Sequence, residues 1–225
     1  MIYTYYMDVR CFDNEALFQE KIKILSPYRQ QKAALLKHEK DKNRSLGAGL
    51  LLDHALAVYG LRERSVEYEI GKWGKPVLKY HPEIHFSLSH SGDYAICSIG
   101  DHPVGNDIEH IRQGRLKVAD RFFAAEEQDW LYAVEDEEER TRRMFRIWTM
   151  KESFLKVTGR GMSLPLSEFA VHVDEESQRI RVRHKVDAKY YHMKEYDGIG
   201  NYCVAVCSQE DQDIAYDMIP VEARF

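Results

Sequence analysis

Two acidic residues on one predicted strand are the first candidates for chemistry in this sequence. Residues 104–109 follow Pro103 and predict a short strand, on which Asp107 and Glu109 share a face. At roughly 6.5 Å and an effective dielectric constant of about 20, two such carboxylates repel each other by on the order of 2 to 3 kcal/mol. A shared divalent cation would reverse that repulsion, and hard oxygen ligands suit Mg²⁺. Most isolated Asp-x-Glu pairs are solvated loop residues, so this pair alone does not define a site.

A second cluster of charged residues lies on a predicted helix. Residues 138–157 have helical periodicity and Gly159 supplies a stop. The apolar positions of this helix are Met144, Ile147, Trp148, Phe154 and Leu155. Glu152 and Lys156 lie one turn apart, a spacing that ordinary surface Glu–Lys pairs also have. Together with Asp107 and Glu109, they supply a third carboxylate and a lysine, which fits a magnesium ion plus a diphosphate.

These segments resemble the signature of one enzyme family. The matching stretches are 74–76, 86–92, 105–109, 148–156 and 159–166, and the resemblance extends over most of the chain. They closely resemble the 4′-phosphopantetheinyl transferases of the surfactin (Sfp-like) type. One departure is Asn106, which stands where the family usually has an aliphatic residue. By strand alternation Asn106 points away from Asp107, so we expect the metal site to be unaffected.

The resemblance implies an activity and its catalytic residues. It implies transfer of the 4′-phosphopantetheinyl group from coenzyme A to a serine of an apo acyl- or peptidyl-carrier protein, with release of adenosine 3′,5′-bisphosphate. The reaction would depend on Mg²⁺, with Mn²⁺ as the other candidate ion. Asp107, Glu109 and Glu152 would bind the metal, and Lys156 would neutralise charge on the leaving bisphosphate. Glu152 could also accept the serine proton, although a metal-bound carboxylate is a poor base unless one oxygen stays free.

Coenzyme A carries a diphosphate and a 3′-phosphate, so its pocket requires several cations and hydrogen-bond donors. The resemblance implies that the coenzyme A site is lined by Arg44, Lys75, Pro76, Ser89, His90, Lys156 and Lys32, with Arg29 as a further extension. For His90 the alternative is a structural histidine at a strand end. For Arg29 and Lys32 the alternative is a solvated helix face.

Hydrophobic periodicity and turn residues predict an α+β order of elements. Strands are expected at 2–9, 66–70, 77–78, 84–89, 94–99, 104–109, 169–173, 180–186, 190–196 and 202–208, and helices at 14–25, from 26, at 40–59 and at 138–157. Residues 92–98 and 200–208 are faintly alike, which suggests a duplication. This agrees with the two pseudo-symmetric α/β halves of the resembled fold, with the active site in the cleft between them. We expect residues 1–103 to hold the nucleotide end, and residues 104–225 the metal ligands and the carrier docking segment.

Composition places the chain among globular proteins. Its 225 residues, 44% of them hydrophobic, can bury a substantial core. The N-terminus lacks signal-peptide character and no run of about 18 apolar residues occurs, so we expect a cytoplasmic protein without a membrane segment. The four cysteines lie in or beside apolar segments without zinc spacing, which favours buried thiols, and the ten histidines form no ligand cluster. The resemblance implies a monomer.

A basic, partly apolar stretch at 111–125 is the candidate docking surface. It holds four basic residues against one acidic residue, interleaved with apolar side chains. Such a segment could receive an acidic amphipathic helix, or simply bury its aromatics and solvate its arginines. The resemblance favours carrier docking near Arg112, Leu116, Lys117, Phe122 and Phe123. By contrast, the acidic residues 135–139 indicate a solvated helix start.

Two other functions remain compatible with these residues. Three carboxylates and a lysine could serve a magnesium-dependent nuclease or phosphohydrolase, but the net charge of −5 disfavours binding to nucleic acid. A catalytically silent carrier-binding module should have lost a metal carboxylate, and all three are present.

Overall fold

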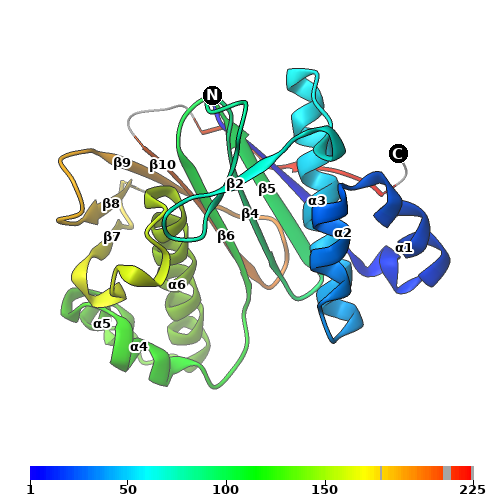
Figure 1. Cartoon of the computed structure of the whole chain (residues 1–225). Helices are drawn as coiled ribbons and strands as arrows, with labels where there is room; N and C mark the ends of the chain where they lie inside the picture. The colour runs from blue at the N-terminus through cyan, green and yellow to red at the C-terminus, as the bar shows by residue number, and fades with distance from the viewer. Residues whose placement is uncertain (178, 210–213, 224–225) are drawn as a thin grey trace.

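Two β-sheets meet at neighbouring edge strands in the centre of the molecule (Figure 1). The computed structural model describes residues 1–177, 179–209 and 214–223. The first sheet has the order β11-β1-β5-β4, with β1 (Tyr3–Asp8), β4 (His85–Ser91), β5 (Tyr94–Gly100) and β11 (Ile219–Pro220). The second has the order β6-β10-β9, with β6 (Val104–His110), β9 (Tyr191–Tyr196) and β10 (Tyr202–Gln209). Strands β4 and β6 are the two adjacent edges.

The two sheets repeat one topology. In each, an opening strand pairs antiparallel with the last strand of a later hairpin, β1 with β5 and β6 with β10. One long helix precedes each hairpin in the chain, α3 (Glu39–Leu56) or α6 (Glu137–Thr158). The faintly similar segments 92–98 and 200–208 contain most of the equivalent strands β5 and β10. The predicted α+β fold of two similar halves is therefore confirmed, although β11 pairs with β1 and returns the chain to the first half.

The helix boundaries follow the capping residues of the sequence. Ser26 accepts the N–H of Arg29 at the start of α2 (Pro27–Ala34), and Asn14 caps α1 (Glu15–Lys21). Asp136 caps α6, whose first turn holds three glutamates, and Gly159 at φ +66° ends it. The predictions of these helices and of a solvated start to α6 are confirmed.

Shorter elements complete the two halves. They are the helices α4 (Leu116–Phe122) and α5 (Ala125–Tyr132) and the strands β2 (Tyr68–Ile70), β3 (Pro76–Leu78), β7 (Ala170–Asp174) and β8 (Arg179–Arg183). Each half has its own apolar core, built around α3 in the first and around α6 in the second. A third apolar cluster lies at the junction and contains Ile2, Ile96, Val104, Ile108, Val204 and Val206. The junction therefore has a buried apolar core of its own.

Two expectations about composition can be compared with the structure. Cys97, Cys203 and Cys207 are buried free thiols as predicted, but Cys11 is exposed because it lies in a short 3₁₀ turn after β1. Among the described residues, no helix is both long enough and apolar enough to cross a membrane.

Candidate active site

Strand β6 and helix α6 bring Asp107 and Lys156 into direct contact. The Nζ of Lys156 donates to Asp107 Oδ1 at 2.7 Å and to the carbonyl oxygen of Asn106 at 2.9 Å. Asp107 is only 5% exposed, so it is a buried carboxylate with a specific cationic partner. Truncating its side chain would leave that lysine without its carboxylate partner, and variants at this position must preserve the shape of the side chain.

Glu109 and Glu152 share the electrostatic environment of Asp107. Burial and the negative charge of Asp107 raise the pKa of Glu152 to about 7, against the smaller opposing effect of Lys156. Burial and the same aspartate also raise the pKa of Glu109 above its ordinary value. Asp107 is therefore close enough to both glutamates for its negative charge to disfavour their ionisation.

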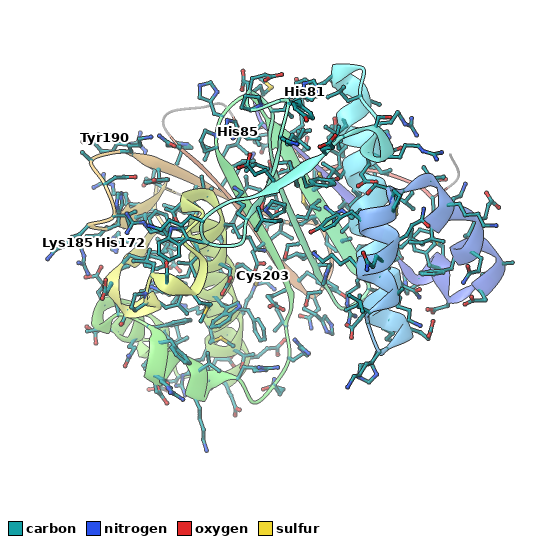
Figure 2. All side chains as sticks on the ribbon, in the orientation of Figure 1. His81, His85, His172, Lys185, Tyr190 and Cys203 are labelled. Carbon is teal, nitrogen blue, oxygen red and sulfur yellow. The ribbon has the colours of Figure 1, made fainter. Side chains whose placement is uncertain are left out.

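The carboxylates are not gathered around a common centre. Within the parts of the chain that the structure describes, no group of three His, Cys, Asp or Glu side chains is arranged to hold a metal ion. One oxygen of each of two carboxylates already has a partner: Asp107 Oδ1 accepts from Lys156 and Glu109 Oε2 accepts from Ser91. Figure 2 places His81 and His85 in the first half and His172 in the second.

The oxygen set nevertheless fits a hard cation. Asp107 Oδ2 is buried and has no hydrogen-bond partner among the residues that the structure describes, an arrangement that carries a desolvation cost. The raised pKa values of Glu109 and Glu152 come first from burial and then from the nearby negative charge of Asp107. A divalent cation would relieve both costs, so the metal role of these three residues stays a prediction with structural support.

A cavity of about 400 Å³ collects the predicted coenzyme A residues. Six of the seven line it: Lys32, Lys75, Pro76, Ser89, His90 and Lys156. Arg44 lies beside it, where it donates to the carbonyl oxygen of Gly92 and pairs with Asp41. Since Lys156 also contacts Asp107, the cavity and the carboxylates are parts of one site.

The cavity wall around His90 is cationic. The side chain of His90 is exposed, yet surrounding protein atoms partly desolvate it and lower its pKa, with further contributions from Arg44, Lys156 and Lys32. Three cationic side chains, Arg44, Lys156 and Lys32, thus act on one region of the cavity. This arrangement suits a ligand with several phosphates.

Arg29 and Lys75 have structural contacts that the sequence did not indicate. Arg29 is 5% exposed, lies 3.8 Å from the carboxylate of Glu63 and stacks on Tyr68, so the solvated helix face considered for it is wrong. Lys75 Nζ donates to the carbonyl oxygens of Val104 and Lys156, each at 2.8 Å. Burial and Lys156 lower the pKa of Lys75 to about 8. Lys75 therefore connects the start of β6 to the end of α6 while it lines the cavity.

The candidate docking segment forms a turn and helix α4. Phe123 is 3% exposed and belongs to the core of the second half, so its assignment as a surface anchor is wrong. Leu116 and Phe122 are partly buried against that core, while Arg112 and Lys117 are exposed. Helix α4 was not among the predicted helices, and the alternation of apolar and basic residues could not identify which aromatic ring turns inward.

A small cavity of about 100 Å³ adjoins Glu109 and was not predicted. It is lined by Arg112, Arg115, Met144 and Trp148 in addition to Glu109. The sequence assigned Met144 and Trp148 only to the apolar face of α6. Their position next to a carboxylate of the site depends on the contact between α6 and the docking segment, which no local pattern specifies.

The raised pKa of Glu152 predicts a pH-dependent effect on stability. Its folded-state pKa of about 7 exceeds the ordinary 4.5, so the folded protein binds more protons between these values and loses stability as pH rises. In chelator, Glu152→Gln should therefore be more stable than wild type at pH 8 by about 1 to 2 kcal/mol, and equal to it near pH 4. Thermal unfolding across pH would measure this. The exposed Glu137→Gln at the start of α6 is the control, and a Glu152→Gln effect that does not vary with pH would contradict the assignment.

Comparisons with known proteins identify relatives of this chain. A family model of the 4'-phosphopantetheinyl transferase superfamily matches residues 103–207. 4'-Phosphopantetheinyl transferase Sfp from Bacillus subtilis (strain 168) is 32% identical over 92% of this chain and 91% of its own. 4'-Phosphopantetheinyl transferase psf-1 from Bacillus pumilus is 40% identical over 61% of this chain and 59% of its own.

A solved structure gives a more limited likeness. The holo-(acyl-carrier-protein) synthase from Bacillus anthracis str. Ames, in complex with CoA (3',5'-ADP), is 16% identical, with a TM-score of 0.42 over 49% of this chain and 96% of that chain. An overlap of that size supports no conclusion by itself. The sequence relationship is decisive, because it spans nearly the whole of both chains: this chain belongs to the 4′-phosphopantetheinyl transferase superfamily.

Proposed function

We propose that the protein transfers the 4′-phosphopantetheinyl group of coenzyme A to a serine of an apo acyl- or peptidyl-carrier protein and releases adenosine 3′,5′-bisphosphate. The observation that carries the proposal is Lys156, which lines the 400 Å³ cationic cavity and also holds the buried carboxylate Asp107. The named transferases that resemble this chain over most of its length support the same reaction. They also weigh against the nuclease alternative.

Asp107, Glu109 and Glu152 would hold Mg²⁺ or Mn²⁺. When bound, the cation would neutralise the diphosphate and stabilise the leaving group. The unpartnered Asp107 Oδ2 and the raised pKa values of the two glutamates support this assignment.

The protein groups act by position and charge. The serine oxygen of the carrier attacks the phosphorus next to the pantetheine, and the bond from that phosphorus to the oxygen of the leaving bisphosphate breaks. Lys156 supplies positive charge to the leaving bisphosphate through its Nζ. Glu152 accepts the serine proton through an oxygen not used for the cation. No covalent enzyme intermediate forms.

Coenzyme A would lie with its nucleotide end against the first half. Lys32, Arg44, Lys75 and His90 would meet its phosphates, with Pro76 and Ser89 completing the wall. We assign residues 1–103 to this role, and residues 104–225 to the metal ligands and carrier docking. The protein would act as a monomer in the cytoplasm, a reducing compartment that suits its free cysteines.

The carrier protein would dock on the turn and helix α4. Arg112 and Lys117 are exposed and can meet an acidic carrier helix, while the partly exposed Leu116 and Phe122 supply apolar contact. Arg112 lies 3.8 Å from Glu109, so the docking surface adjoins the carboxylates. A carrier bound there would bring its serine towards the site.

The proposal is tested by weighing carriers. A panel of apo acyl- and peptidyl-carrier proteins is incubated with the protein, coenzyme A and Mg²⁺, and their masses are then measured. A responsive carrier should gain one phosphopantetheinyl group, only when coenzyme A and Mg²⁺ or Mn²⁺ are both present. Complete transfer in excess chelator would exclude the metal role. No gain on any carrier that an active control transferase modifies would exclude the activity.

A further inference from the structure

Strand β4 meets strand β6 through serine side chains rather than through a backbone ladder. The two strands belong to different sheets. Ser87 Oγ accepts the backbone N–H of Asn106 at 3.0 Å. In the same way, Ser89 Oγ accepts that of Ile108 at 3.4 Å. The hydroxyl oxygens thus satisfy edge N–H groups of β6 that a neighbouring strand would otherwise pair.

A third serine continues this pattern with the same period. Ser91 Oγ accepts the backbone N–H of His110 at 3.2 Å. The serines recur at every second residue of β4, and so do the N–H groups on β6. A serine hydroxyl has one proton to donate in addition to its acceptor lone pairs, so each serine can make a second hydrogen bond.

At two of the three positions that proton goes to a carboxylate of the proposed metal site. Ser89 donates to Asp107 Oδ1 at 2.7 Å, and Ser91 donates to Glu109 Oε2 at 2.7 Å. Ser87 accepts the N–H of Asn106, so the residue equivalent to Asp107 and Glu109 at this position is Gly105, which has no side chain. The row of serines therefore contains its own control: one serine has the backbone contact opposite a glycine, and two have an added contact to a carboxylate.

Each serine contacts only one of the two oxygens of its carboxylate. Ser89 and Lys156 both use Oδ1 of Asp107, and Oδ2 is left buried and without a partner. Ser91 and Arg112 both lie at Oε2 of Glu109. Holding one oxygen fixes the rotation of the carboxylate and directs the other to a ligand, as hydrogen-bonded partners of metal ligands do in other proteins.

We propose that Ser91 is a positioning residue for Glu109, and that strand β4 of the first half in this way orients the carboxylates carried by the second half. This inference rests on the proposed metal role of Asp107 and Glu109. The serines do not touch the reacting groups through these contacts. They fix the carboxylates so that the site is complete only when the two halves are joined at this edge.

The test measures cation binding directly. Wild type, Ser91→Ala, Ser91→Thr and Ser87→Ala are saturated with coenzyme A and titrated with Mn²⁺, and free Mn²⁺ is followed by electron paramagnetic resonance. We expect Ser91→Ala to weaken Mn²⁺ binding roughly tenfold, the lower range for loss of a partner that orients a metal ligand. Ser91→Thr, which keeps the hydroxyl, should restore most of the affinity.

The control separates positioning from stability. Ser87→Ala loses a backbone contact of the same kind, so it should also lower the melting temperature but leave Mn²⁺ affinity unchanged. Equal Mn²⁺ affinity for wild type and Ser91→Ala, or an equal loss in Ser87→Ala, would show that the serines only join the strands. Absence of Mn²⁺ binding by wild type would instead overturn the metal role of the carboxylates, and this inference with it.

Discussion

Asp107→Asn is expected to lower the rate of phosphopantetheinyl transfer by on the order of a thousandfold or more. The asparagine keeps the shape of the side chain and can accept from Ser89 and Lys156 through its oxygen. It cannot contribute a negative charge to a bound cation, and several kcal/mol of transition-state stabilisation correspond to a factor of this size. The rate is measured at saturating coenzyme A, carrier and Mg²⁺, so that a change in affinity is not mistaken for a change in the chemical step.

The fold should survive this substitution. The new amide nitrogen would occupy the position of Oδ2, which is buried without a partner, at a cost of about 1 to 3 kcal/mol. Thermal unfolding of Asp107→Asn checks that the protein is folded at the assay temperature. Asp101→Asn, at an exposed carboxylate in the loop before β6, serves as the control and should retain the wild-type rate. A rate for Asp107→Asn within a few-fold of wild type would remove Asp107 from the catalytic site.

The sequence predicted most elements because their ends are encoded locally. The cap at Ser26, the proline at position 27 and the left-handed glycine at 159 each mark a helix boundary through their own backbone chemistry. Strand alternation likewise placed Asp107 and Glu109 on one face. These signals depend on residues within a few positions of one another, so they can be recognised in a single sequence.

Contacts between segments that lie far apart in the chain were not predictable in this way. Ser91 meets Glu109 across the junction of two sheets, and Lys75 reaches backbone carbonyls 29 and 81 residues away. Phe122 and Phe123 are adjacent and chemically alike, and only the packing of α4 determines that Phe123 is buried. The motif Ser-x-Ser-x-Ser on β4 was visible in the sequence, but its partners are N–H groups that every residue except proline carries. Only the three-dimensional structure could identify them.

Asn106 and Asp107 are neighbours on β6 with different roles, one in joining the two halves and one in the proposed chemistry. The side chain of Asn106 is fully buried and donates to the carbonyl oxygen of Ser87 and to Ser98 Oγ. As predicted from alternation, these contacts involve neither Asp107 nor Glu109. The polar residue thus joins β6 to the first half while its neighbour serves the proposed chemistry.

Gly105→Ala is expected to lower the stability of the protein by about 3 kcal/mol or more, the upper range for overpacking in a core. A Cβ at this position would lie 2.0 Å from the carbonyl oxygen of Ser153 and 2.4 Å from the backbone nitrogen of Val157. Both atoms belong to the backbone of α6, which cannot rotate away as a side chain can. Strand β6 and helix α6 would have to separate, and the 2.7 Å contact between Asp107 and Lys156 depends on their approach.

Gly49→Ala is the matched control for this close approach. Its Cβ would lie 2.5 Å from Leu25 Cδ1, the end of a flexible side chain, and alanine gains up to about 1 kcal/mol over glycine within helix α3. We therefore expect a small net change there, against a fall in melting temperature of roughly 6 to 12 °C for Gly105→Ala. Transfer by Gly105→Ala, assayed well below its melting temperature, should also be impaired, because the spacing between its carboxylate and lysine has changed. Equal melting temperatures for the two variants would mean that β6 and α6 can move apart freely, and that their close packing does not set the geometry of the site.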